Sequence, residues 1–143
     1  MHNVIQIKQK ERGQSMVELA LTITFLMALL AGTIDLGRAF FTWLAMRDAA
    51  QEGASFGTFN PTNISEVQAR VWDNLEQVVI SPTVNINVSV DTPDGTCPGD
   101  EIIVDVDYPT FTVTMPFLGT ILGSQQIPIH ATINDRIIAP LCP

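Results

Sequence analysis

The pattern of hydrophobic and polar positions divides the chain into three regions. In the first, no charged residue occurs from Leu19 to Ile34, a run slightly shorter than the ~20 residues of a typical transmembrane span. Apolar flanks lengthen the run, and no proline occurs from Gln14 to Phe59. We therefore expect one continuous helix to about Gly57. Its length of roughly 65 Å is about twice the hydrocarbon thickness of a bilayer, so its second half should protrude.

The second region has helical spacing. Asn60-Pro61 ends the first helix, and Thr62 or Asn63 is expected to cap the next one. Apolar residues then recur every three or four positions, which indicates an amphipathic helix with one buried face. These positions are Ile64, Val67, Val71, Leu75, Val78 and Val79.

The third region, after Ser81-Pro82, has a period of two. This alternation predicts three or four antiparallel strands with one buried and one wet face. Pro128 suggests that the last strand has an exposed edge. The fold class is therefore α+β, a long transmembrane helix continuing into a small head of one amphipathic helix and a sheet. The alternating stretches are 84–90, 102–108, 111–115 and 127–133.

Charges around the apolar run predict its orientation. Residues 1–13 are basic on balance and acidic residues follow the run, which places the N-terminus in the cytoplasm. We expect a cytoplasmic leader over 1–13, a membrane-spanning and protruding helix over 14–58, and an extracytoplasmic head over 59–143. A cleaved secretory signal is the rival, but no good small-residue cleavage site follows the run. An interfacial aromatic belt is expected at Phe40, Phe41 and Trp43.

Composition excludes some functions. The net charge is -8, and basic residues do not cluster beyond the leader, so we expect no nucleic-acid partner. Catalytic signatures such as G-x-S-x-G, H-E-x-x-H or a Walker loop do not occur in the sequence, and His130 stands alone on a predicted strand. We expect no enzymatic activity, no cofactor and no metal site.

Two motifs have ordinary interpretations. The acidic segment 91–101 offers oxygen ligands for calcium but lacks the EF-hand pattern, which favours a solvated turn. Asn63-Ile64-Ser65 and Asn87-Val88-Ser89 match the glycosylation sequon, which also occurs often by chance.

The two cysteines, Cys97 and Cys142, do not form a C-x-x-C pair, so a zinc or thioredoxin-like site has no support. If the head is exported, a disulfide between them is plausible. Two unrelated thiols are the alternative.

Small residues recur every four positions on the protruding helix, at Ala45, Ala49, Gly53 and Gly57. Such a row lets another backbone approach closely. It suits packing against a neighbouring subunit and packing against the protein's own head equally well.

Two charged positions follow the apolar run. Asp35 and Arg38 are three residues apart and can pair on one helical face. A boundary ion pair is one interpretation, and a marker of the point where the helix leaves the bilayer is another.

The N-terminal motif is ERGQSMVE at 11–18. A carboxylate such as Glu18 at the edge of an apolar helix is costly and usually has a partner or a task. If the peptide bond after Gly13 is cut, Gln14 gains a free amine that can neutralise Glu18 of a neighbouring subunit during helix bundling. A Glu18 at headgroup level without a special partner is the alternative.

These residues resemble the N-terminal signature of TadE-like proteins, the pilin-like components of tight-adherence pilus systems. The resemblance is dense over 12–57 and looser over 100–137. Its features are the R-G-Q-S junction, Glu18, the apolar run, Asp35-Leu36-Gly37-Arg38 and the A-A-x-E-G-A segment Ala49–Ala54.

The resemblance implies cleavage by prepilin peptidase between Gly13 and Gln14, and a role for Glu18 in subunit recruitment. It also implies a secretion ATPase, a platform membrane protein, and other pilin-like subunits or further copies of the chain as partners. The expected location is the cell membrane, with an extracellular filament after assembly. The alternatives are a membrane-resident assembly factor and a membrane-tethered binding module, neither of which polymerises.

Overall fold

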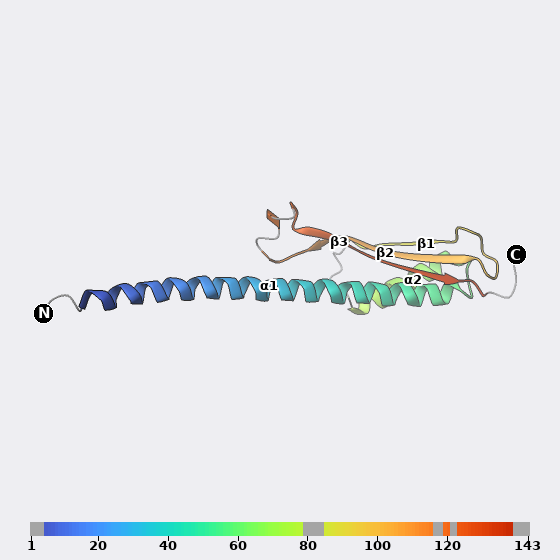
Figure 1. Cartoon of the computed structure of the whole chain (residues 1–143). Coiled ribbons are helices and arrows are strands. Elements are labelled where there is room, and N and C mark those ends of the chain that lie inside the picture. The colour runs from blue at the N-terminus through green and yellow to red at the C-terminus, as the bar shows by residue number, and fades with distance from the viewer. Residues whose placement is uncertain (1–4, 79–84, 116–118, 121–122, 139–143) are drawn as a thin grey trace.

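The computed structural model describes residues 5–78, 85–115, 119–120 and 123–138. A long helix, α1, runs the length of the molecule, and a small head packs along its C-terminal half (Figure 1). The head contains a second helix, α2, and an antiparallel sheet of three strands. The expected α+β fold class is confirmed.

Helix α1 spans Ile5–Gly57. It is continuous, as expected from the absence of proline, and it begins before Gly13, so that part of the leader continues the same helix. Its end lies where predicted: the amide of Thr58 still donates to the carbonyl of Ala54, at 2.9 Å. Pro61 follows three residues later and lacks the amide that would continue the pattern.

Helix α2 spans Ile64–Val78. The backbone carbonyl of Asn63 accepts hydrogen bonds from the amides of Glu66 and Val67, which makes Asn63 rather than Thr62 the capping residue. Val67, Val71 and Leu75 are buried as the helical spacing predicts, whereas Ile64 at the first turn is 39% exposed. Val79 lies outside the described residues.

The sheet has the order β1–β2–β3, with β1 at Asn87–Asp91, β2 at Glu101–Thr112 and β3 at Gln126–Arg136. Both pairs are antiparallel. The stretches 102–108 and 111–115, described separately in the sequence, belong largely to one strand. The register shifts between Tyr108 and Phe111, where Pro109 lacks a ladder donor, so the alternation breaks without ending the strand.

The core lies between the helices and one face of the sheet. Alternate residues of β2, Ile102, Val104 and Val106, are almost completely buried, and their neighbours in sequence face outward. Pro128 lies on β3, an edge strand, as expected. Residues from α1 complete this core, namely Met46, Ala49, Ala50 and Ala54.

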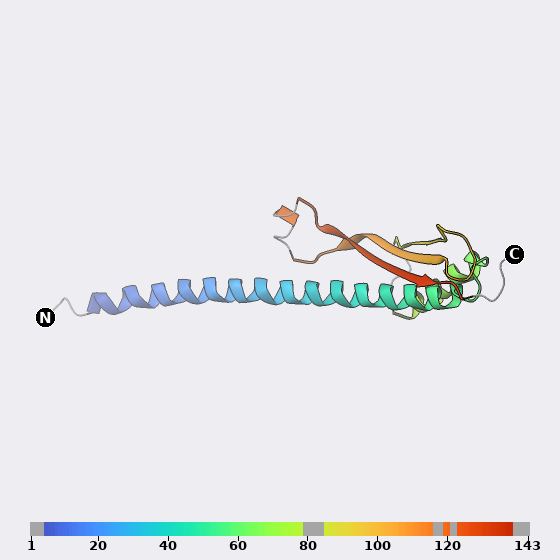
Figure 2. The same cartoon turned by 45° about the vertical axis from the view of Figure 1, so that its right-hand side comes forward.

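The paired ends of β2 and β3 reach beyond the head along α1, towards its N-terminus (Figures 1 and 2). We call residues 108–129 the hairpin arm. Residues 116–118 and 121–122 of the arm lie outside the described residues. The described part of the arm contacts Asp35 and Arg38 of α1.

Candidate functional site

The N-terminal half of α1 projects alone beyond the head (Figure 2), and its apolar side chains are exposed. Leu21 is 68% exposed and Phe25 is 64% exposed. The helix is long and apolar enough to cross a membrane over Gly13–Gly57, and none of its most apolar stretch is buried within the protein. An apolar surface of this extent on one helix fits a bilayer or other apolar helices.

The predicted processing and assembly residues lie on this projecting half. Gly13, Gln14 and Glu18 are all exposed on α1. A Cβ atom added to Gly13 would meet nothing within 4 Å, so no close packing in the described structure requires a glycine there. Among the described residues, no hydrogen bond or ion pair engages the Glu18 carboxylate, although its backbone carbonyl accepts from the Thr22 hydroxyl at 2.8 Å.

Asp35 lies where the projecting half meets the hairpin arm. Its side chain pairs with Arg38, the Oδ1 and Nη1 atoms being 3.4 Å apart. The other oxygen of the carboxylate, Oδ2, accepts a hydrogen bond from the Met115 amide at 2.6 Å. Asp35 is only 5% exposed, so the carboxylate is both paired and buried under the arm.

Arg38 extends the same junction. Its Nη1 atom donates to the Thr114 hydroxyl at 2.7 Å, and its guanidinium lies 5.5 Å from the centre of the Phe111 ring. The ion pair expected from sequence is present, and it is also a clamp that fixes the hairpin arm to α1. We call the contacts of Asp35 and Arg38 with residues 111–115 the arm clamp.

The row of small residues packs against the protein's own head. Ala45 is 7% exposed and Ala49 is completely buried. A Cβ atom on Gly53 would lie 2.4 Å from Val71 Cγ2, and one on Gly57 would lie 2.3 Å from Ile102 Cδ1. The sequence left open whether this row packs against a neighbouring subunit or against the protein's own head. The structure shows these four residues packed within the chain.

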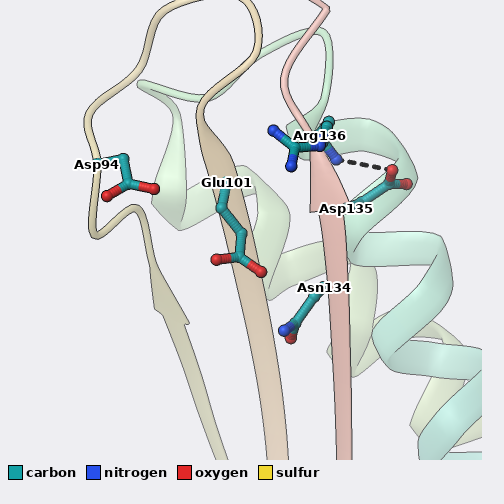
Figure 3. A pocket seen from close by; sticks show the side chains of 5 residues that line it. All are labelled: Asp94, Glu101, Asn134, Asp135 and Arg136. Atoms are coloured by element: carbon teal, nitrogen blue, oxygen red, sulfur yellow. Dashed lines mark hydrogen bonds between the residues drawn. The ribbon is translucent and has the colours of Figure 1, made fainter.

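The opposite end of the sheet carries a polar pocket of about 240 Å³. Asp94 and Glu101 line it together with the end of β3 (Figure 3), where the Arg136 amide donates to the Asp135 carboxylate. The acidic segment 91–101 forms the adjoining turns, in which Gly95 and Gly99 have positive φ angles. No group of three or more potential metal ligands occurs within the residues that the structure describes.

The remaining candidate residues are spread over the surface. Phe40, Phe41 and Trp43 are exposed on α1, and Arg47 lies 5.7 Å from the Trp43 ring centre. His130 contacts Asp107 at 2.8 Å on the outer face of the sheet. Cys97 lies in the turns before β2, and Cys142 lies outside the described residues, so the bridge between them stays a prediction.

Sequence reasoning missed the partners of the arm clamp. Thr114 and Met115 were seen only as part of an alternating strand, and neither carries a charge that points to Asp35. The one available signal was the carboxylate itself, because a carboxylate next to an apolar run requires hydrogen-bond donors. That signal does not say which segment supplies them.

Comparison with known protein families identifies the N-terminal part of the chain. Residues 13–55 match the model of the family described as TadE-like protein. This match confirms the resemblance over the N-terminal part of the chain. No curated protein and no solved structure gave a significant match.

The TadE-like segment begins at Gly13, at the predicted junction, and includes both the projecting apolar half of α1 and most of its head-covered half. It therefore contains Glu18, the arm clamp residues Asp35 and Arg38, and three residues of the small row. The match fits a pilin-like protein related to the Tad pilus, in which a structural role is expected rather than catalysis.

Proposed function

We propose that this protein is a pilin-like structural subunit of a tight-adherence, type IV pilus-related surface appendage, anchored and assembled through α1. The observation that carries the proposal is the exposed apolar half of α1 within the TadE-like segment. Such a helix first lies in the cell membrane and then packs against the helices of other subunits. The head would face outward, with the N-terminus in the cytoplasm.

Processing between Gly13 and Gln14 is part of the proposal. A glycine inside a helix costs about 0.5–1 kcal/mol relative to alanine, and Gly13 has open space around it. A glycine without a packing reason suits a cleavage site for prepilin peptidase, which would leave Gln14 with a free amine. Cleavage would also remove the first turns of α1.

Glu18 then acts in assembly. A carboxylate near the end of a membrane helix costs on the order of 1–3 kcal/mol, depending on depth. The Gln14 amine of a neighbouring subunit would neutralise it, and both Gln14 and Glu18 are exposed on α1 and accessible to such a neighbour. A secretion ATPase and a platform membrane protein would drive the assembly.

Variants of Glu18 test the proposal. Glu18→Val should still reach the membrane and be cleaved, because insertion depends on total hydrophobicity, yet it should fail to assemble. Glu18→Asp should be intermediate because it keeps the charge and shortens the reach. Glu18→Gln should fail nearly as completely as valine, because an amide cannot neutralise an ammonium group.

The membrane-bound and assembled fractions of the three variants give the answer. Normal assembly of Glu18→Val contradicts the role of this carboxylate. Finding the wild-type protein only in membranes, and never in sheared surface fibres, favours a membrane-resident assembly factor instead. Capture of a ligand by the head without polymerisation favours a tethered binding module.

A further inference from the structure

The side of α1 that points away from the head stays apolar beyond the membrane-spanning run. Gly37 is two residues from Asp35, so the helix turns it by about 200° away from the arm clamp. A Cβ atom on Gly37 would meet nothing within 4 Å. Phe40 and Phe41 follow on the same side of the helix and are 54% and 68% exposed. The head therefore packs on one side of α1 and leaves the opposite side open.

These residues have the spacing of a helix-packing site. Gly37, Phe40, Phe41 and Leu44 occupy positions i, i+3, i+4 and i+7, which are the four residues of one helix that surround a side chain inserted from a facing helix. Because Gly37 has no side chain, a second backbone can approach closely at this point. A glycine inside a helix lowers its stability, and no contact among the described residues requires one here.

Lipid covers little of this side. The rise from Gln14 to Ile34 is about 30 Å, the thickness of the hydrocarbon core, and the headgroup layer adds about 5–8 Å on each side. Phe41 lies about 10 Å beyond Ile34 along the helix and Leu44 about 15 Å beyond it, so both lie above that layer. An interfacial aromatic belt suits tryptophan and tyrosine, which carry a polar atom, whereas phenylalanine has none. These side chains therefore require a protein partner.

Charges just above the apolar residues favour a second copy of this chain as the partner. Arg47 and Asp48 follow Leu44 and lie about 100° apart around the helix, on opposite flanks of the open side. Asp48 forms no ion pair among the described residues. When the same side of two parallel helices meets around a two-fold axis, opposite flanks face each other. Arg47 of each copy then faces Asp48 of the other, and Phe40 faces Phe41 in the same way.

From this geometry we propose that the open side of α1 binds the same side of a second copy, as a parallel pair in the membrane. The inference rests on the anchoring and helix packing in the proposed function, and it adds the partner, its orientation and the point of closest approach. Both N-termini lie in the cytoplasm, so the paired residues lie at equal height. Both heads point away from the shared axis and do not obstruct the pair. We call these residues the docking side: Gly37, Phe40, Phe41, Leu44, Arg47 and Asp48.

A photoreactive residue in the full chain tests the pair. p-Benzoylphenylalanine replaces Phe41 on the docking side or, as the matched control, Phe25 in the apolar run. Phe25 is 64% exposed, and helix geometry turns it by about 160° from Phe41, so it should face lipid. Each protein is placed in phosphatidylcholine vesicles, illuminated, and analysed by intact-mass spectrometry.

The proposal predicts a product of two chains from the probe at Phe41, and one chain joined to a lipid from the probe at Phe25. Adding Gly37→Val to the Phe41 probe should abolish the two-chain product, because the valine side chain fills the point of closest approach. Gly37→Ala should retain most of the product, because a methyl group is small. The thermal unfolding midpoint of the head should be equal in both variants, which excludes misfolding as the cause.

Exchange of the two charges tests the orientation of the pair. Asp48→Arg should reduce the two-chain product from the Phe41 probe, because it places like charges opposite each other. Adding Arg47→Asp to that variant should restore the product, since each copy again presents one charge of each sign. A double variant that stays as low as Asp48→Arg overturns the two-fold arrangement.

Three further outcomes contradict the proposal in distinguishable ways. Lipid products from both probes leave the anchor intact and overturn the docking side. Equal two-chain products from both probes, or a two-chain product that persists in Gly37→Val, show contact between copies without a defined face. No lipid product from the Phe25 probe shows that α1 is not inserted, so the anchoring in the proposed function fails as well.

Discussion

The two halves of α1 are both apolar, but they use their apolar residues differently. Leu21 and Phe25 in the projecting half are mostly exposed, whereas Met46 and Ala49 in the other half are completely buried against the head. The head therefore accounts for the hydrophobicity of the second half only. The hydrophobicity of the first half requires a partner outside the chain, and this is the physical basis for placing it in a membrane and then in an assembly.

Glycines show the same contrast more sharply. Gly53 has no room for a side chain, because a Cβ atom would lie 2.4 Å from Val71. Gly13 and Gly37 have open space around them, and no contact among the described residues explains Gly37. The same residue type therefore serves packing in one half of the helix, and at Gly13 we assign it to processing. Substitutions that affect one half and spare the other test this division.

The predicted disulfide should have the largest effect, and only on the head. A bridge from Cys97 to Cys142 would close a loop of about 45 residues and stabilise the head by roughly 4 kcal/mol. Cys97→Ser should lower the free energy of unfolding by about that amount without changing membrane insertion. Denaturant unfolding of the exported protein in detergent measures the loss, and two alkylatable thiols per wild-type chain contradict the bridge.

Gly53→Val should have the next largest effect. The added methyl groups would overlap Val71 and approach the Val67 carbonyl, with a cost of about 3 kcal/mol, at the upper end for overpacking. The matched control, Gly37→Val, enters open space and should change head stability little. Equal thermal unfolding midpoints for the two variants would contradict the packing described for Gly53.

Asp35→Ala tests the boundary between the two halves. Removing the carboxylate leaves the Met115 amide without its acceptor and Arg38 without its ion pair, at a cost of about 2 kcal/mol. Asp35→Asn should lose less because the amide oxygen still accepts a hydrogen bond. Hydrogen exchange at the Met115 amide reports the change locally. Unchanged exchange in the alanine variant shows that the arm clamp does not hold the arm.

Gly13→Ala should have the smallest effect on stability, a gain of about 0.5–1 kcal/mol of local helix stability with no change in the unfolding of the head. Processing should tolerate this change, because alanine is small. Gly13→Leu should leave the head equally stable and block cleavage. A Gly13→Leu protein that is cleaved as fast as wild type contradicts the role of this residue.

Much of the fold could be predicted because local pattern determines it. The absence of proline predicted the length of α1, and the spacing of Val67, Val71 and Leu75 predicted the buried face of α2. The continuity of β2 through Pro109 was less evident, because a proline that ends one strand and a proline at a register shift look alike in a single sequence.

The sequence predicted only those contacts of the candidate site that join residues close together in the chain. Asp35 and Arg38 are three residues apart, so their pairing follows from helix geometry. The Met115 amide lies far away in sequence, and its contact with Asp35 depends on how the sheet packs on α1. Similarly, Ala49 and Gly53 lie on one helical face whether they pack against the head or against another subunit. Their spacing alone therefore could not decide between these two packing partners.

The mature N-terminus is the most direct test of the central claim that the projecting half of α1 is a processed assembly helix. Intact-mass spectrometry and N-terminal sequencing of the protein from its native cells should give a chain that begins at Gln14. A mature chain that begins at Met1, in cells with an active prepilin peptidase, would contradict the account.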